Sequence, residues 1–540
     1  MRAINQFYPK ILNSRFKGET CAGFIRIVFL FVVFGPILVL VFNVIQKLGT
    51  GHWDWLALAF PTGRRLALFA RSLGFAISVT AGATIIGLLA GLYFWNQSGK
   101  GNKFLCWLAL VFIAVPPYVH ALTWMSAFNG LEIIFRRFNL PAIALEGWGG
   151  ALWVQMMALV PVALGMTLLG VETIDPDHLD AARLARPDSA NVLKVILPLA
   201  LPLVIAGAGF IFLLSLTDYS VASLFQNNVY ALEIFAEFSS SAESGRAFLL
   251  ALPLLLVTVS VLIVSQKTVR KAAMKPVRTL PSPDRHFAWP SWMRALLGIG
   301  AAFTAIAVLV PLAVLLLSAG SPKALARTVT AAQSEIGFTF AISLLIALIS
   351  IPLAVACAGR LVRSNRNHRL WWLLVTIPIA VPASLTGIGL VFLWNRPLFG
   401  TVYGGALMPI LAGLARFAPF VTLAVAAQLR RINPLLLDAA RVYQTNLWRY
   451  WLKIRLPLLL PGIAGGAGIA FLLSLGELGA TLVVAPPGLA TLTMRIYNYL
   501  HYGASDSVAG LCLIILVSAL AGGTGVLIVF RRGFRLVRKG

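Results

Sequence analysis

The chain has 540 residues, of which 59% are Ala, Val, Ile, Leu, Met, Phe, Trp, Tyr or Cys and only 11% are charged. A soluble domain carries about 25% charged residues, so this composition excludes an ordinary cytosolic enzyme. The formal net charge is +26, from 44 Lys plus Arg and 18 Asp plus Glu. In a soluble protein such a charge would suggest nucleic acid as a partner, so the positions of the basic residues decide what the charge means.

Twelve apolar stretches are long enough to cross a bilayer, which takes about 20 mostly apolar residues per helix. The first stretch follows several basic residues but has no small-residue cleavage pattern after it, so we expect a retained anchor and not a signal peptide. The sequence therefore predicts an all-α polytopic membrane protein with 12 transmembrane helices. The stretches lie near residues 25–46, 72–95, 104–128, 150–171, 199–226, 247–266, 295–318, 337–359, 370–394, 405–427, 458–484 and 507–530.

Basic residues are distributed unequally between the two sides of this arrangement. With the N-terminus inside, the inner segments hold 32 of the 44 Lys and Arg, the outer loops hold 11, and Arg416 lies within a span. The positive-inside rule then places both termini in the cytoplasm. The basic residues near 267–278 could bind nucleic acid, but retention of this segment inside and contact with anionic membrane lipid explain them better. We therefore expect lipid and no nucleic acid among the partners.

The two halves of the chain repeat each other, most clearly in one inner loop and the span after it. Residues 179–183, Leu-Asp-Ala-Ala-Arg, recur at 437–441 with an offset of 258, and residues 212–216, Phe-Leu-Leu-Ser-Leu, recur at 471–475 with an offset of 259. Residues 114–116, Ala-Val-Pro, recur at 380–382. We expect an N-terminal six-span half over 1–266, a basic cytoplasmic linker over 267–292 and a C-terminal six-span half over 293–540. An even number of spans per half predicts parallel repeats around a central path.

Each repeated loop contains a helix-start signal. Asp175-Pro176 and Asn433-Pro434 combine an Asx N-cap with proline at the first helical position, so a short helix should begin at each. Such a helix, held rigidly against a membrane helix, could act as a lever for an external motor. The plain alternative is an interfacial loop that only connects two spans.

The repeated loops also resemble a known signature, E-A-A-x-x-x-G-x9-I-x-L-P, of binding-protein-dependent ABC importer permeases of the type I fold. The second copy has Asp438-Ala439-Ala440 and then Ile454, Leu456 and Pro457 at the family spacing. The first copy has Asp180-Ala181-Ala182 and Leu197-Pro198 with one residue fewer, and neither copy has the motif glycine. The resemblance implies coupling helices that dock into grooves on two ATP-binding cassette ATPase subunits, while a periplasmic solute-binding protein delivers cargo. It assigns the coupling to Asp180, Ala181, Ala182, Arg183, Pro198, Asp438, Ala439, Ala440, Arg441 and Pro457.

The chain further resembles the fused two-half permeases of the iron(III) importer group, through three segments at the end of the fifth span of the second half and between its fifth and sixth spans. They are residues 476–481, Gly-Glu-Leu-Gly-Ala-Thr, residues 485–488, Ala-Pro-Pro-Gly, and residues 500–503, Leu-His-Tyr-Gly. The resemblance implies a permease of the bacterial inner membrane that moves ferric iron. Thiamine and 2-aminoethylphosphonate permeases are similar, so those cargoes stay open.

Catalytic motifs are missing from the sequence. Residues 98–101, Ser-Gly-Lys-Gly, lack both the upstream glycine and the following hydroxyl residue of a phosphate-binding loop. We therefore expect this chain not to be an enzyme and to bind no cofactor, with ATP and Mg on the partner subunits. Because every outer loop is under about 30 residues, substrate capture would also need a partner.

Two acidic residues occupy equivalent positions after the fifth-span repeat, Asp218 and Glu477. An ionisable group near the bilayer centre costs about 2.5 to 3.5 kcal/mol on insertion scales and normally faces water or a partner. Asp218, Glu477 and Arg416 are thus candidates for a translocation path that suits a cationic cargo or a gate. The alternative is a helix-packing interaction with Arg416.

Aromatic residues near the last span could be taken for hard-metal ligands: Tyr497, Tyr499, His501 and Tyr502. An interfacial aromatic belt explains them better, so we expect no metal site.

Two other functions remain in competition with an ABC permease. Six plus six parallel spans also describe a gradient-driven secondary transporter, but its repeated acidic-basic glycine signature is absent after the second and eighth spans. The second alternative is a membrane-embedded enzyme that acts on lipid. The sequence contains no repeated cluster of polar residues that would support such an activity.

Overall fold

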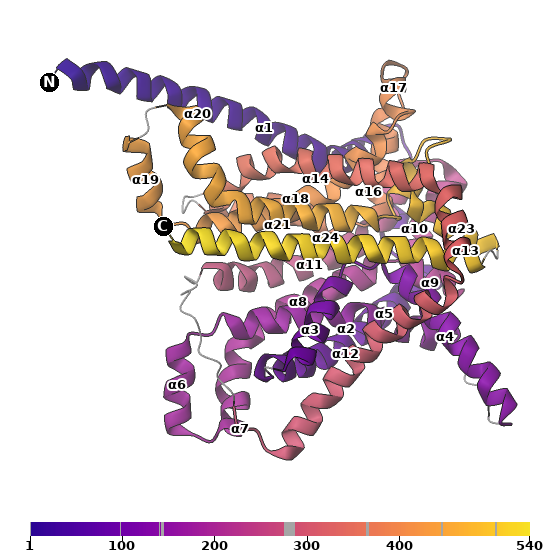
Figure 1. The fold of residues 1–540 in the computed structure, drawn as a ribbon. Helices are drawn as coiled ribbons and strands as arrows, with labels where there is room; N and C mark the ends of the chain where they lie inside the picture. Colours follow the sequence, from indigo (N-terminus) through magenta and orange to yellow (C-terminus); the bar gives the residue numbers. More distant parts are fainter. Residues whose placement is uncertain are drawn as a thin grey trace.

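The computed structural model describes the backbone of residues 2–97, 99–139, 141, 145–274, 287–362, 367–443, 446–502 and 505–539, and most side chains between residues 20 and 525. The regular structure in these residues is entirely helical (Figure 1). Within the described ranges, ten helices are long and apolar enough to cross a membrane, and the number rises to 12 if each of two bent helix pairs counts as one span. The expected all-helical polytopic architecture is confirmed.

The first half contains the following elements: α1 (Arg2–Gly49), η1 (Trp53–Ala59), α2 (Gly63–Asn96), α3 (Lys100–Phe112), α4 (Pro117–Arg137), α5 (Gly147–Glu172), α6 (Pro176–Ala185), α7 (Asp188–Asn191), η2 (Val192–Ile196), α8 (Leu197–Thr217), α9 (Ser220–Leu224), α10 (Tyr230–Ser241) and α11 (Ser244–Met274).

The second half repeats this order with α12 (Ser291–Ser318), α13 (Pro322–Ala331), α14 (Gln333–Val362), α15 (His368–Thr376), η3 (Ile377–Ala380), α16 (Ala383–Trp394), η4 (Pro397–Phe399), α17 (Gly400–Tyr403), α18 (Leu407–Arg431), α19 (Pro434–Tyr443), α20 (Leu447–Tyr450), η5 (Trp451–Arg455), α21 (Leu456–Leu475), α22 (Thr481–Val484), α23 (Leu492–Tyr502) and α24 (Ser505–Lys539). Helices α6 and α19 lie at one end of the molecule, which we call the loop face, and α10, α13, α17 and α23 lie toward the opposite face (Figure 1).

The third span of each half is broken, which corrects the continuous helices expected near 104–128 and 370–394. The chain bends by 117° between α3 and α4 and by 99° between the α15–η3 segment and α16. Both breaks fall at the repeated Ala-Val-Pro sequence, where Pro116 and Pro382 are extended N-cap residues. Proline has no N–H to continue a helix and pushes the preceding residue out of the helical region, so the same tripeptide breaks both spans.

The fifth spans end earlier than the expected boundaries near 226 and 484. Helix α8 stops at Thr217 and α21 stops at Leu475, and short helices α9 and α22 follow. Asp218 is the extended C-cap residue of α8, and its carboxylate accepts hydrogen bonds from the first backbone N–H groups of α9, those of Ser220 and Val221, at 3.2 and 3.5 Å. Asp218 and Glu477 therefore follow the helix ends instead of lying within the spans.

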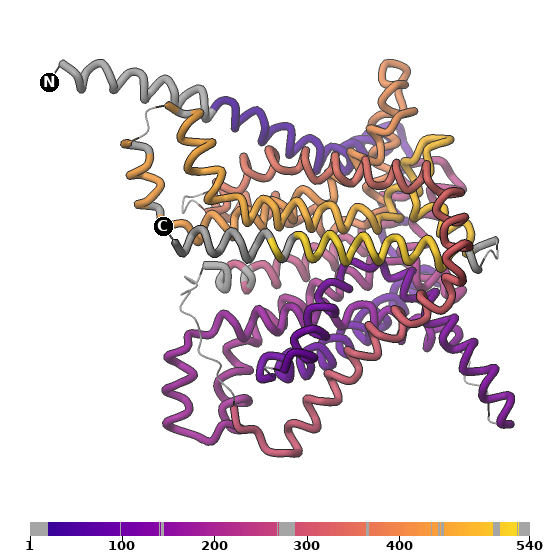
Figure 2. The backbone as a smooth tube through the Cα atoms, viewed as in Figure 1, coloured from indigo at the N-terminus to yellow at the C-terminus, as the bar shows by residue number. Residues whose placement is uncertain are grey.

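The first span of each half packs on the other half. In the other half, helix α1 contacts α14, α16 and α18, and α12 contacts α2, α3, α4 and α5. Figure 2 shows the indigo α1 beside the orange second half and the rose α12 beside the purple first half. A Cβ at Gly300 of α12 would lie 2.7 Å from the backbone N of Ala90 in α2, so only glycine permits this approach. The two halves are thus clasped together by exchanged helices.

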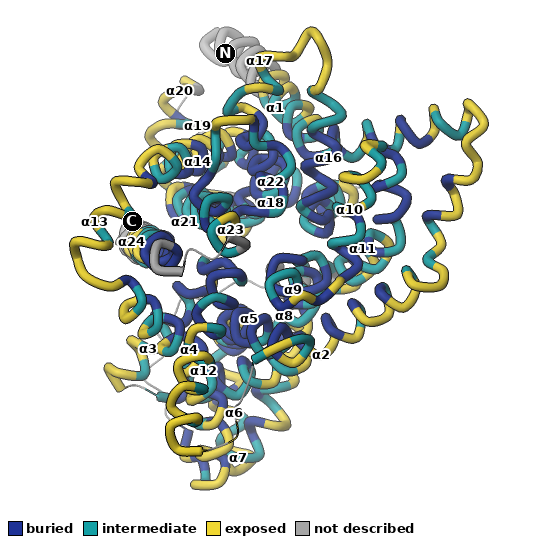
Figure 3. The backbone as a smooth tube through the Cα atoms, turned by 90° about the vertical axis from the view of Figure 1, so that its right-hand side faces the viewer, coloured by how far each residue is buried: buried dark blue, intermediate teal, exposed yellow. Residues whose placement is uncertain are grey.

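The surface of the bundle matches an apolar surrounding. The exposed side of α1 carries Phe24, Ile27 and Phe42, which are 69%, 66% and 64% exposed. Seen from the opposite face, the central segments of α5, α18 and α22 are buried and the periphery is exposed (Figure 3). Large apolar side chains on the outside of long apolar helices are typical of contact with lipid.

Candidate coupling loops and a buried charge cluster

Helices α6 and α19 begin at the expected capping signals. The Asp175 carboxylate accepts a hydrogen bond from the N–H of Asp177 at 3.1 Å, and the Asn433 side-chain oxygen accepts one from the N–H of Leu435 at 3.0 Å. Proline follows each cap at the first helical position. The prediction of a short helix in each repeated loop is confirmed.

The segment after each short helix is repeated as well. Helices α7 and α20, and the π-helical turns η2 and η5, correspond at an offset of 259, whereas α6 and α19 correspond at 258. The extra residue of the second copy therefore lies between its two short helices. Each π-helical turn comes directly before a Leu-Pro pair. The wider turn avoids the clash that a proline ring makes with the carbonyl four residues earlier.

The motif residues divide into an anchored face and an open face. Leu179 of α6 is only 5% exposed and packs in a hydrophobic cluster with Val192 and Ile196, and Leu437 packs against the core of the second half. The remaining motif residues lie mainly on the surface: Asp180, Ala181, Pro198, Asp438, Ala439 and Pro457 are exposed, and Ala182, Arg183 and Ala440 are half-buried. The side chain of Arg441 lies outside the described residues.

Large apolar side chains surround this open face without being covered. Leu184 at the end of α6 is 93% exposed, and on and after α19 Leu435, Tyr443 and Trp448 are 74%, 95% and 74% exposed. Apolar side chains gathered at the end of a bundle mark an interaction surface.

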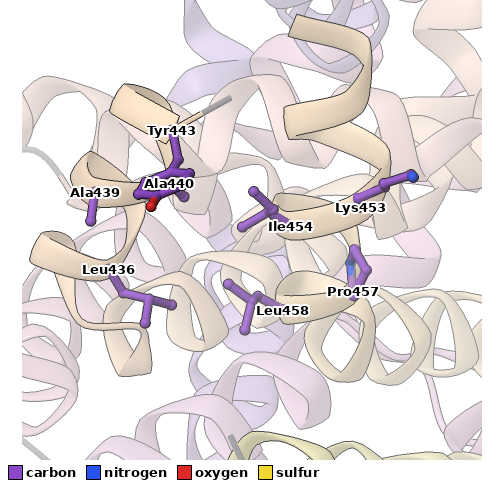
Figure 4. Close-up of a pocket in the computed structure, with 8 residues that line it drawn as sticks. All are labelled: Leu436, Ala439, Ala440, Tyr443, Lys453, Ile454, Pro457 and Leu458. Atoms are coloured by element: carbon purple, nitrogen blue, oxygen red, sulfur yellow. The ribbon is translucent and has the colours of Figure 1, made fainter. Parts of the chain in front are cut away.

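A groove lies between α19 and the η5–α21 segment. Figure 4 shows the α19 residues on one side and the η5 and α21 residues on the other. The groove has a volume of about 480 Å³ and is lined by Leu436, Ala439, Ala440, Tyr443, Lys453, Ile454, Pro457 and Leu458. Both motif alanines and the motif isoleucine and proline are among them, so these motif positions shape an apolar surface.

The charged residues of the spans form a cluster at the ends of α8 and α21. Glu477 forms an ion pair with Arg416 of α18, and its carboxylate also accepts a hydrogen bond from the N–H of Ala480 at 2.7 Å. Asp218 accepts hydrogen bonds from the Ser220 hydroxyl at 2.8 Å and from the Gln155 amide at 3.3 Å.

The two equivalent acids therefore have different surroundings. Arg416 interacts electrostatically with Asp218 too, but its ion pair is with Glu477. The side chain of Arg416 retains 26% exposure and that of Glu477 retains 7%. The pair expected from the packing alternative is present, and protein atoms do not cover its arginine completely.

The helix breaks of the third spans meet this cluster. A Cβ at Gly476 would lie 2.5 Å from the Cγ of Pro116, and a Cβ at Gly479 would lie 2.7 Å from the Cβ of Ala383. The break residue of the first half thus contacts the second half directly. Sequence analysis missed Gln155 and Pro116 as neighbours of the acids, although the repeated Ala-Val-Pro was a signal for the latter.

The aromatic residues near the last span make ordinary polar contacts. Arg495 donates hydrogen bonds to the Tyr499 hydroxyl at 2.9 and 3.1 Å and pairs with Glu335 at 2.5 Å. The side chains of His501 and Tyr502 lie outside the described residues. Among the residues that were described, no group of three or more His, Cys, Asp or Glu side chains could hold a metal ion.

Comparison with known families identifies this architecture. The family model described as "Binding-protein-dependent transport system inner membrane component" matches residues 83–272 and again residues 350–533. The chain belongs to this family and contains two tandem permease domains. It is the transmembrane, noncatalytic subunit of an ABC importer, a multi-pass protein of the bacterial inner membrane type that works with ATPase subunits and a solute-binding protein.

Individual relatives match about a third of the chain or less. A molybdenum transport system permease protein of Haemophilus influenzae is 28% identical over 35% of this chain and 88% of its own length. A putrescine transport system permease protein of Escherichia coli is 26% identical over 34% of this chain and 68% of its own length. A putative 2-aminoethylphosphonate transport system permease protein of Salmonella typhimurium is 27% identical over 27% of this chain and 54% of its own length. The cargoes in these three names differ from one another, and iron is not among them.

Proposed function

We propose that this permease moves ferric iron from the periplasm to the cytoplasm by alternating access, powered by two separate ATPase subunits. The loop face, with both chain termini, is then cytoplasmic, and a periplasmic solute-binding protein docks on the opposite face. The proposed coupling to ATPase subunits rests on one observation. Two equivalent capped helices lie at one end of the molecule, and each carries exposed apolar side chains. A gradient-driven transporter has no use for such a pair.

The coupling role belongs to the ten motif residues named above. The small alanines of each Asp-Ala-Ala sequence allow a partner backbone to approach closely. Leu179 is buried beneath α6, so a push on the exposed face is passed to the following span and is not absorbed by the loop. ATP binding would close the two motor subunits, draw the two loops together and open the path toward the periplasm.

The charge cluster supports a cationic cargo. Arg416 neutralises Glu477, while the hydrogen-bond donors of Asp218 are neutral groups, so the three side chains carry one net negative charge when all are ionised. In this proposal Asp218, Glu477 and Arg416 line the translocation path. Thiamine is also a cation and 2-aminoethylphosphonate carries an ammonium group, so both remain alternatives. Equilibrium binding of ferric iron, thiamine and 2-aminoethylphosphonate to the purified solute-binding protein distinguishes the three.

The coupling role is tested by reversing charge on both short helices. Asp180→Lys combined with Asp438→Lys should reduce recovery of the ATPase subunits at least severalfold when the permease is purified from membranes in mild detergent, because both residues lie on the docking faces. Membrane insertion should be unchanged. Glu132→Lys on α4, at an exposed ion pair with Arg136, is the matched control and should retain the ATPase. Full recovery of ATPase by the double variant would contradict the lever role.

A further inference from the structure

The chain segment just before α12 is tied to the first coupling loop. Asn96 at the end of α2 donates a hydrogen bond to the backbone carbonyl of Phe287 at 3.0 Å and accepts one from its N–H at 2.8 Å. One side chain thus pairs with both backbone groups of Phe287, as a neighbouring strand would. Asn96 and Phe287 are 6% and 4% exposed, so the two hydrogen bonds are sheltered from water.

The coupling loop itself supplies the next contacts. The carboxylate of Asp188, at the start of α7, accepts a hydrogen bond from the N–H of Ala288 at 2.7 Å and pairs with Arg183 of α6 at 3.3 Å. The Arg183 guanidinium lies over the Phe287 ring, 4.5 Å from its centroid. Arg183, a residue of the repeated motif, therefore faces the linker and not only a partner.

Apolar packing continues the same connection. Phe287, Trp289 and Met293 share one buried cluster with Leu179 of α6 and Leu92 of α2. The cluster joins three elements that are distant in sequence: the end of α2, the first coupling loop and the beginning of α12.

We propose that residues Phe287–Trp289, which we call the strap, position the first coupling helix, so that α6, the end of α2 and the start of α12 move as one body. This inference rests on the proposed function, since it concerns how motor-driven movement of α6 is passed on. Helix α12 packs along α2 and against α4, and the break before α4 contacts Gly476. The strap thereby gives α6 a route to the far end of the path in addition to α8.

The test compares two distances in the complete complex of permease, ATPase subunits and solute-binding protein. In a cysteine-free background, one spin-label pair is placed at Leu184→Cys and Leu296→Cys, on α6 and α12, and another at Leu184→Cys and Tyr443→Cys, on the two coupling helices. All three positions are exposed in the permease by itself, and because Leu184 and Tyr443 border the proposed docking faces, copurification of the ATPase subunits with each labelled pair is confirmed before trapping. Pulsed electron paramagnetic resonance then measures both distances in the nucleotide-free and vanadate-trapped states.

The strap predicts that trapping shortens the distance between the coupling helices and leaves the α6–α12 distance unchanged. In Asn96→Ala and in Asp188→Ala, the α6–α12 distance should shift or broaden on trapping. Asp188→Asn keeps an acceptor for the Ala288 N–H. In this variant the α6–α12 distance should again be the same, at least in part, in the nucleotide-free and trapped states. Asn446→Ala removes side-chain hydrogen bonds to the backbone of the second loop and should have no effect on this pair.

Each outcome has a separate meaning. If trapping changes the α6–α12 distance in the otherwise unaltered protein, or if neither Asn96→Ala nor Asp188→Ala changes the response, the strap does not position α6. If the distance between the coupling helices never changes although ATPase subunits are bound and trapped, the proposed lever function fails instead.

Discussion

At the scale of single residues, the two halves differ where charge is buried. The equivalent acids Asp218 and Glu477 are served by different partners, an amide from Gln155 and a guanidinium from Arg416. Position 158, which corresponds to Arg416 at the offset of 258, is alanine in the first half. One arginine therefore interacts with two acids, so the charge cluster is electrically asymmetric between the two halves.

Removing Arg416 should destabilise the protein strongly. Arg416→Gln leaves Glu477 without a counter-charge in a position where it is 8% exposed, and breaking a buried ion pair from one side typically costs 3 to 5 kcal/mol. We expect a clear drop in the melting temperature of the detergent-purified complex.

The double variant Arg416→Gln, Glu477→Gln serves as the control for this change, because no charge is left unpaired. It should recover much of the lost stability. A double variant less stable than Arg416→Gln alone would show that Glu477 stabilises the protein without Arg416, through contacts such as its hydrogen bond with the Ala480 N–H, and would contradict the expected cost of the unpaired charge.

At the scale of elements, helix breaks and close crossings decide the architecture. The broken third spans were predicted as continuous helices because a hydropathy window averages across Pro116 and Pro382. The capping signals at Asp175 and Asn433, in contrast, act through neighbouring residues only, and they predicted the start of α6 and α19 correctly. Local chemistry was therefore readable from the sequence, whereas the direction of a helix after a break depends on what it packs against.

The crossing of α12 over α2 gives a matched pair of substitutions on one helix. Gly300→Ala should lower stability and the yield of folded protein, because the new Cβ would lie 2.5 Å from the Cβ of Leu89 and 2.7 Å from a backbone nitrogen. At Gly298 the nearest atom to a Cβ is 3.9 Å away, and replacing glycine by alanine favours the helix by roughly 1 kcal/mol. Gly298→Ala should thus be neutral or stabilising.

Thermal unfolding followed by fluorescence in detergent measures both variants. Equal effects of the two substitutions would mean that the α2–α12 crossing is loose enough to adapt.

At the scale of the whole molecule, exchange of the first spans was not predictable from the repeat. The repeat correctly indicated two tandem domains, which the family matches at 83–272 and 350–533 bear out. It contains no information on which half α1 or α12 packs against, because that choice depends on contacts between segments hundreds of residues apart. The contacts of Phe287 and Ala288 with the end of α2 and the first coupling loop escaped prediction for the same reason. The division into a first half ending at residue 266, a linker over 267–292 and a second half starting at residue 293 remains a prediction from the sequence. Helices α1 and α12 each pack across this division.

Cutting the linker should therefore not separate the halves. We expect a permease with a protease site inserted between residues 275 and 286 to remain one complex after cleavage in mild detergent, since α1 contacts three helices of the other half and α12 contacts four. Copurification through a tag on one half measures this. As a control, residues 319–540 expressed beside residues 1–274 lack α12 and should be retained much less. Release of the second half on cleavage alone would contradict the clasped arrangement.

The exchange of first spans also constrains biosynthesis. Helix α1 enters the membrane first, yet most of its neighbours belong to α14, α16 and α18, which begin at Gln333 or later. During translation the side of α1 that contacts these helices faces lipid or an insertion factor until they arrive, although α11 of its own half can pack on α1 earlier. Joining both halves in a single polypeptide guarantees that the awaited neighbours come from the same ribosome.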